Sequence, residues 1–105
     1  MARKSVHAEL SVLPIGTGST SLGEYIAKSI NALKNVDGIR YQVTPMGTLL
    51  ESDSIDRIFT AAKAVTNTLF KLGVKRVETI LKIDERRDKK ASLEDKLRSI
   101  KRYCK

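Results

Sequence analysis

Residues 6–12 alternate between apolar and polar side chains, the pattern of a β-strand whose two sides have different surroundings. The apolar side is typical of a strand that covers a core, and it consists of Val6, Ala8, Leu10 and Val12. The polar side consists of His7, Glu9 and Ser11 and turns apolar at Leu13. Because the same alternation recurs in later segments, we expect a sheet with one polar, partly charged face that the chain's own helices leave open. Such an open face suits a small polar ligand, a partner subunit, or both.

The length of 105 residues fits a single domain, 1–105, with one hydrophobic core. The longest apolar runs are too short to span a bilayer, and the start at Met1 lacks the apolar segment of a signal peptide, so we predict a cytoplasmic protein with no membrane partner. The chain has one cysteine, Cys104, and one histidine. An internal disulfide is therefore excluded, and we predict no metal site and no required cofactor.

The spacing of apolar and turn-forming residues predicts the remaining elements. They are a helix over 21–36, strands over 39–44 and 48–52, a helix from 53 or 54 to 72, a strand over 74–84 and a helix beginning at Ser92. Ser21 and Glu24 have the spacing of a reciprocal capping box at the start of the first helix. Pro45-Met46-Gly47 marks the reversal between the two short strands, which predicts a hairpin.

The element order is thus βαββαβ followed by a terminal helix. With right-handed connections, this order predicts a ferredoxin-like α+β sandwich, in which a four-stranded antiparallel sheet carries two helices on one face, plus a C-terminal helix. In a monomer, Leu13, Met46, Leu49 and Ile80 would form an apolar patch near the open face. Self-association is therefore expected.

The formal net charge of +8 is concentrated near the C-terminus, because residues 85–105 hold nine basic and four acidic side chains. Such a run is most often a solvated loop and helix. The alternative is a basic RNA-binding module, since the RNA-recognition fold has the same element order. That fold binds bases with aromatic side chains on its open sheet, where this chain places residues such as His7, Glu9 and Gln42. We therefore expect nucleic acid to be the less favoured partner.

Three segments resemble one known family. They are Leu-Pro-Ile-Gly-Thr-Gly at 13–18, Tyr-Gln-Val-Thr-Pro-Met-Gly-Thr at 41–48 with Glu51, and 76–79 continuing through 83–89. The chain is similar to the small thiamine-binding protein family over nearly its whole length. The resemblance implies a ferredoxin-like protomer, homodimers joined through their sheets and commonly assembled to tetramers, no catalytic activity, and binding of thiamine or its hydroxymethylpyrimidine moiety. Ser52 stands where a glycine is expected after the glutamate.

Thiamine carries a thiazolium charge and an aminopyrimidine with donor and acceptor groups, so its site needs carboxylate, hydroxyl and apolar partners. The expected carboxylates are Glu9 and Glu51, the hydroxyls Ser11, Thr44 and Thr48, and the apolar wall Leu13 and Met46. Each has an alternative. Glu9 and Glu51 can form ion pairs, Glu9 with Arg76 or Lys82, the two threonines can reflect strand propensity, and Met46 can be a packing residue.

Two further interpretations are less favoured by the residues. The Gly16-Thr17-Gly18 loop before a helix can bind phosphate through backbone amides, but it lacks a P-loop lysine, and chain reversal is the simpler role. An acyl-phosphate hydrolase on this fold would need an anion-binding arginine in the first loop, and 14–18 contains none, so we predict no enzyme. The sequence leaves open which form of the ligand is bound and whether the protein stores, carries or senses it.

Overall fold

The computed structural model describes residues 5–104, which form a four-stranded antiparallel sheet and three α-helices, an α+β fold. The expectation about the start at Met1 lies outside the described residues. The elements in chain order are β1 (Ser5–Ile15), α1 (Gly23–Asn31), the 3₁₀ helix η1 (Ala32–Asn35), β2 (Arg40–Thr44), β3 (Gly47–Ser52), α2 (Ile55–Lys71), β4 (Arg76–Arg86) and α3 (Leu93–Lys101). Within residues 5–104, no helix has the length and apolar character needed to cross a membrane.

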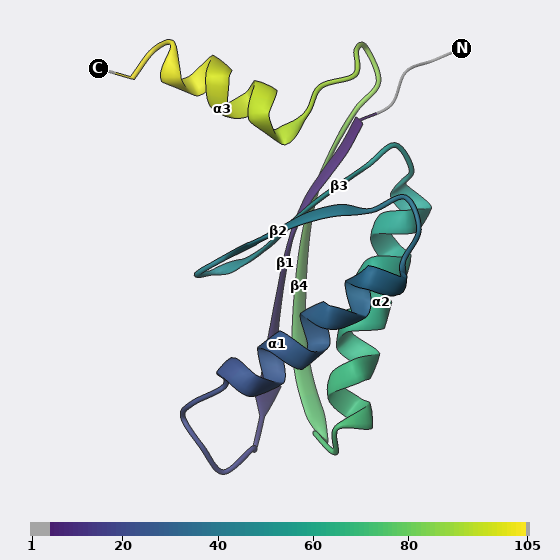
Figure 1. Ribbon diagram of the computed structural model, residues 1–105, viewed down its shortest axis with the longest axis vertical. Coiled ribbons are helices and arrows are strands. Elements are labelled where there is room, and N and C mark those ends of the chain that lie inside the picture. The colour runs from purple at the N-terminus through teal and green to yellow at the C-terminus, as the bar shows by residue number, and fades with distance from the viewer. Residues whose placement is uncertain (1–4, 105) are drawn as a thin grey trace.

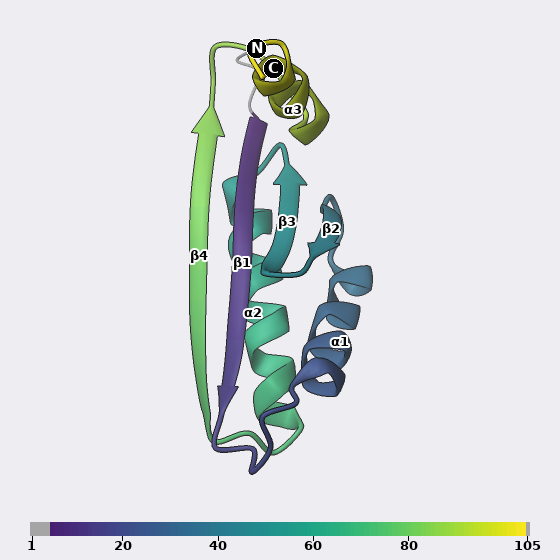
Figure 2. The ribbon, with the colours of Figure 1, turned by 90° about the vertical axis from the view of Figure 1, so that its left-hand side faces the viewer.

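The strands lie in the order β2-β3-β1-β4 (Figure 2). β1 and β4 pair along their whole lengths, from Ser5 opposite Arg86 to Ile15 opposite Arg76. β3 pairs with β1 only as far as Leu10, which lies opposite Thr48. Beyond that pair the β2–β3 hairpin diverges from β1, as Figure 1 shows. The second half of β1 therefore has a strand neighbour on one side only.

The core lies between the sheet and the two longer helices. α2 runs behind β1 and β3 in Figure 2, with α1 alongside it. The buried apolar residues of the core are Val6, Ala8, Leu10, Leu33, Leu50, Ile58, Ala61, Ala62 and Val65. The apolar side of β1 faces α2, as its alternation predicts, because a strand places successive side chains on opposite faces. The opposite face, which bears His7, Glu9, Ser11 and Leu13, is called the open face below.

The open face is not entirely free of helix, which corrects the expectation from the sequence. His7 is only 4% exposed, because the segment before α3 crosses that end of the sheet. The Nε2–H of His7 donates to the carbonyl of Ala91 (2.8 Å), and the amide of Ala91 donates to Ser5 Oγ (2.7 Å). Alternation within a strand does not reveal such a cover, because the contacting segments are more than 80 residues apart.

α3 begins against the sheet and then extends away from it. Its first turn is fixed by the capping box of Ser92 and Asp95, a start that the sequence places correctly. Within α3 no residue is buried. In Figure 1 the helix projects on the side of β1 and β4 opposite to α2.

The first helix departs from its predicted form. α1 begins at Gly23 rather than at 21, Leu22 occupies the N-cap, and no side chain caps the helix, so the predicted Ser21–Glu24 capping box is wrong. The amide of Ser21 instead bonds to Ser19 Oγ (3.0 Å), which keeps the serine in a loop turn. The C-terminal part of the predicted helix is the tighter η1, as helix ends often are. The hairpin, α2 and β4 lie where the patterns predict, within two residues.

Candidate ligand-binding site at the hairpin end of the sheet

A cavity of about 260 Å³ lies where the hairpin diverges from β1. We call it the hairpin cavity; it is lined by Leu10, Ser11, Val12, Ile26, Ile30, Val43, Thr44, Pro45, Met46, Gly47, Thr48 and Val65. It exists because β3 stops pairing with β1 after Leu10, which leaves a space that the turn and α1 border. The walls are mostly aliphatic, with polar groups from three strands. This composition is typical of a small-molecule site.

The three residues with predicted hydroxyl ligands, Ser11, Thr44 and Thr48, all line this cavity, although Ser11 and Thr48 are on different faces of the sheet. Thr44 Oγ1 donates to the carbonyl of Gly47 (2.8 Å) and accepts from the amide of Met46 (3.4 Å), so it holds the turn together. Thr48 is buried opposite Leu10 on the core side, not on the open face as expected. Among residues 5–104, side-chain hydrogen bonds leave the hydroxyls of Ser11 and Thr48 unengaged and thus able to bind a ligand.

Glu9 lies close to Gly47, which lines the hairpin cavity, and itself borders a separate cavity of about 210 Å³ on the open face. A Cβ on Gly47 would lie 3.1 Å from the carbonyl oxygen of Leu10 and 3.5 Å from Glu9 Cγ. The glycine therefore permits a close approach of the turn to β1 and to the side chain of Glu9. Glu9 is exposed on the open face, next to Lys82 in the ladder, yet within residues 5–104 it makes no salt bridge with Lys82 or Arg76. Its carboxylate is available to a cation.

The two predicted apolar residues differ in position. Met46 is at the tip of the turn, 84% exposed, and lines the hairpin cavity. Leu13 lies farther along the open face opposite Glu78 and does not line the cavity. Its side chain is nevertheless exposed, so it belongs to a surface rather than to a pocket.

Glu51 lies at the opposite end of the sheet and binds the C-terminal segment. Its Oε1 accepts the amide of Leu93 (3.0 Å) and lies 3.4 Å from His7 Nε2, and its Oε2 accepts Arg40 Nη1 (2.8 Å). Arg40 also donates to both carboxylate oxygens of Glu94. We call these five residues, His7, Arg40, Glu51, Leu93 and Glu94, the C-terminal clamp. The structure therefore separates Glu51 from the other predicted site residues.

Charge pairing in and beside the clamp shifts the pKa values of Glu94, Arg40 and Asp84. The hydrogen bonds from Arg40 lower the pKa of Glu94 to about 2, and the same pairing raises the pKa of Arg40. Lys96 Nζ lies 2.6 Å from Asp84 Oδ2 and lowers the pKa of that carboxyl group. These pairs keep the first turn of α3 on the sheet at neutral pH.

A larger cavity of about 580 Å³ lies beside the clamp, bordered by Ser5, Arg40, Glu51 and Ser92 among others. Its size alone would favour it as a ligand site. However, these polar groups already bond to one another or to the backbone of the C-terminal segment. A ligand there would have to replace existing bonds, whereas the hairpin cavity offers free hydroxyls. We therefore consider the hairpin cavity the better candidate.

Sequence reasoning missed several residues of the hairpin cavity. The sequence predicts Pro45 and Gly47 as turn residues only, and it does not single out Val43 of β2 or Ile26 and Ile30 of α1 as site residues. The signal that could have pointed to them is the turn itself, because a tight turn that approaches another strand requires a small residue at the contact.

Comparison with known proteins identifies related chains. The model of a family described as "Thiamine-binding protein" matches residues 8–101. A "UPF0045 protein" of Methanothermobacter thermautotrophicus is 46% identical over 96 residues, which cover 91% of this chain and 96% of the relative.

Solved structures agree in fold. The crystal structure of a hypothetical protein from Methanocaldococcus jannaschii has a TM-score of 0.82 and 39% identity, covering 92% of this chain and 96% of that one. A candidate thiamine biosynthesis or salvage protein from Thermotoga maritima has a TM-score of 0.73 at 24% identity, and the match covers 91% of this chain and 98% of that one. At that identity the second likeness is one of fold.

Proposed function

The chain belongs to the thiamine-binding protein family, and from this premise we propose that it is a non-enzymatic protein that binds thiamine or its hydroxymethylpyrimidine moiety in the hairpin cavity. One observation carries the proposal. Four of the seven residues that the sequence singles out, Ser11, Thr44, Met46 and Thr48, line this cavity, and Glu9 lies beside Gly47, which also lines it. Glu51 and Leu13 lie elsewhere, and a ligand contact by either stays a prediction.

The size of the cavity bears on which part of the ligand it holds. Sites for drug-sized molecules usually measure about 300–1,000 Å³. The hairpin cavity, at about 260 Å³, is slightly smaller and suits one heteroaromatic ring better than two. The hydroxyls of Ser11 and Thr48 can each donate and accept, which matches the amino group and ring nitrogens of an aminopyrimidine. We therefore place the pyrimidine inside the cavity, against the aliphatic wall.

The thiazolium ring of thiamine would then lie at the rim, where Glu9 is exposed beside Gly47. A charge-assisted contact of this kind is worth about 1.5–3 kcal/mol, less where solvent screens it. The neutral hydroxymethylpyrimidine has no such contact. This arrangement therefore favours thiamine over the pyrimidine alone when both fit the cavity.

The protomer fits a homo-oligomer of ferredoxin-like units, and this is part of the proposal. The strand order β2-β3-β1-β4 and the position of α1 and α2 support the ferredoxin-like description. Leu13 is 43% and Ile80 57% exposed on the open face, where an apolar patch is costly in water. A second copy that packs against this face would cover both and bring its surface near Glu9. We propose a homodimer through the open faces, with tetramers as a further assembly.

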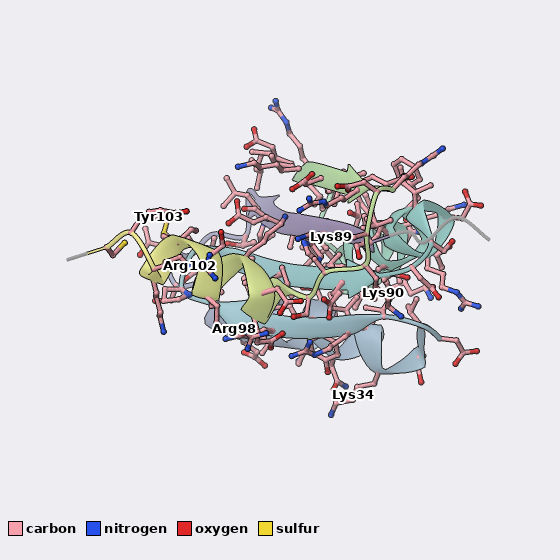
Figure 3. All side chains as sticks on the ribbon, turned by 90° about the horizontal axis from the view of Figure 1, so that it is seen from above. Lys34, Lys89, Lys90, Arg98, Arg102 and Tyr103 are labelled. Carbon is pink, nitrogen blue, oxygen red and sulfur yellow. The ribbon has the colours of Figure 1, made fainter. Side chains whose placement is uncertain are left out.

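The alternative function, RNA binding, is favoured by one observation. Lys89 and Lys90 precede α3, Arg98 lies in it, and Arg102 and Tyr103 follow it (Figure 3). Figure 1 places α3 at one end of the molecule. A basic surface with an exposed aromatic ring is typical of single-stranded nucleic-acid binding. Phosphate contacts would make such binding strongly salt-dependent.

Isothermal titration calorimetry with thiamine, hydroxymethylpyrimidine and thiamine phosphate tests the proposal. We expect Ser11→Ala and Thr48→Val each to weaken binding of the pyrimidine roughly three- to tenfold, by loss of one hydrogen bond. Ser21→Ala, an exposed serine outside the cavity, is the matched control and should bind as the original protein does. No heat with any of the three ligands, together with salt-sensitive RNA binding, would reverse the order of the two functions.

A further inference from the structure

α3 is a short helix whose apolar side has no partner in its own chain. Leu93, Leu97 and Ile100 are spaced to lie on one side of the helix. Leu93 contacts the sheet end, but Leu97 and Ile100 are 54% and 58% exposed. Helices of nine residues are marginal in water without tertiary packing. The exposure of Leu97 and Ile100 therefore indicates that another molecule covers this side of α3.

The direction of the stripe follows from its first residue. Leu93 and Lys96 border a shallow cavity of about 210 Å³ on the open face, together with His7, Glu9 and Leu49. Because Leu97 and Ile100 continue the same side of the helix, they face the space in front of the open face. α3 projects into that space from one end of the sheet (Figure 1). Any body that covers the open face must therefore also meet α3.

A second copy of this chain presents a matching surface. Its Leu13 and Ile80 are exposed on the neighbouring strands β1 and β4, toward the end of the ribbon away from α3. Glu78 lies directly opposite Leu13 and makes no salt bridge among residues 5–104. On α3, Lys101 is likewise without an acidic partner in the described part of the chain, and it flanks the stripe. Apolar and charged groups on the two surfaces are thus complementary.

We propose that α3 of each copy packs over the far end of the β1–β4 ribbon of the other, with Leu97 and Ile100 against Leu13 and Ile80. The arrangement is reciprocal about a twofold axis perpendicular to the strands, because each chain has α3 at one end and the patch at the other. Lys101 then pairs with Glu78 of the second copy. This inference rests on the proposed self-association and is independent of which ligand is bound.

Complementarity argues for a second copy over the other possible occupants. A lipid surface or an RNA would meet the basic residues of α3 but would leave Leu13, Ile80 and Glu78 unexplained. Two copies cover both surfaces at once, and in a twofold dimer each contact between α3 and the β1–β4 patch occurs twice.

The test uses two charge substitutions on the same helix. Ile100→Asp places a carboxylate in the proposed contact, and Ser99→Asp places the same charge on a different, exposed side. We expect Ile100→Asp to raise the dimer dissociation constant by about 100-fold or more in sedimentation equilibrium, since the change occurs twice per dimer. Ser99→Asp should stay within about threefold of the original protein. Circular dichroism checks that both variants remain folded, as exposed positions predict.

Cross-linking identifies what α3 touches. Cys104, the one cysteine and exposed, follows Ile100 by one helical turn and can carry a benzophenone maleimide. With a mixture of ¹⁵N-labelled and unlabelled protein, we expect cross-links between copies to peptides that contain Leu13 or residues 76–80. Cross-links confined to one copy, or equal dissociation constants for the two aspartate variants, would overturn the inference. The inference would also be overturned if the original protein is a monomer, or if it binds anionic vesicles or RNA through α3.

Calorimetry with thiamine on the Ile100→Asp protein separates this inference from the proposed function. If Ile100→Asp leaves the dimer dissociation constant unchanged and the protein binds thiamine, the α3 contact is refuted and the ligand proposal stands. A weakened dimer with no heat from thiamine in the original protein would refute the ligand proposal and keep the α3 contact.

Discussion

Gly47→Ala tests whether the close approach of the turn to β1 shapes the site. The added Cβ would lie 3.1 Å from the carbonyl oxygen of Leu10, several tenths of an ångström inside ordinary contact distance. Leu10 cannot retreat, because it is also paired with Leu81 of β4. The turn must therefore move outward and take Thr44 and Thr48 with it. Strain of this kind costs about 1–3 kcal/mol of folding stability.

The loss of ligand affinity follows from the same displacement. If about 1.4 kcal/mol of the strain opposes the binding geometry, thiamine and hydroxymethylpyrimidine both bind tenfold more weakly. Urea unfolding measures the stability change, and calorimetry measures the affinities. Gly23→Ala is the control, because its Cβ would meet nothing within 4 Å and the residue begins α1. If Gly47→Ala matches the original protein in both measurements, the turn does not depend on this approach and the reasoning is wrong.

Three other changes have distinct expected outcomes. Glu9→Gln should weaken thiamine up to about tenfold and leave the neutral hydroxymethylpyrimidine within twofold in calorimetry; equal losses would remove the cation role. Leu50→Ala, at a fully buried core position, should lower the free energy of unfolding in urea by about 2–5 kcal/mol, and a loss below 1 kcal/mol would contradict the packing. Because the pKa of Glu94 is lowered from 4.5 to about 2, its pair with Arg40 is complete above pH 4.5 and is lost as the pH falls toward 2. Amide hydrogen exchange, corrected for its intrinsic pH dependence, should show residues 91–96 losing protection over that range but not between pH 5 and 7.

Local patterns predicted most of the fold because the relevant forces act between near neighbours. The hairpin follows from Pro45-Met46-Gly47, α2 from the spacing of its apolar residues, and the start of α3 from Ser92. α1 was placed too long because the serines before it can form loop turns as readily as a helix cap.

The site was harder to predict because it depends on long-range register. Thr48 is on the core side only because β3 pairs Leu50 with Ala8, and alternation alone does not fix which strands pair. Glu51 was assigned to the ligand because nothing near it in the sequence shows that the amide of Leu93, 42 residues away, is its partner. The segment around Pro45 that resembles the family forms the turn that lines the hairpin cavity, and its role as a ligand site stays a prediction.

Because β3 diverges from β1 after Leu10, the part of the hairpin that packs in the core is separate from the turn that borders the hairpin cavity. The β1–β3 pairs that end at Leu10 contribute the core residues Val6, Ala8, Leu10 and Leu50, and the turn at 44–47 lies beyond them. Substitutions at the turn tip, such as at Met46, can thus alter which molecule is recognised while leaving the capacity to fold nearly untouched. Substitutions that change ligand specificity at the turn tip would therefore cost little folding stability, provided that Gly47 is kept.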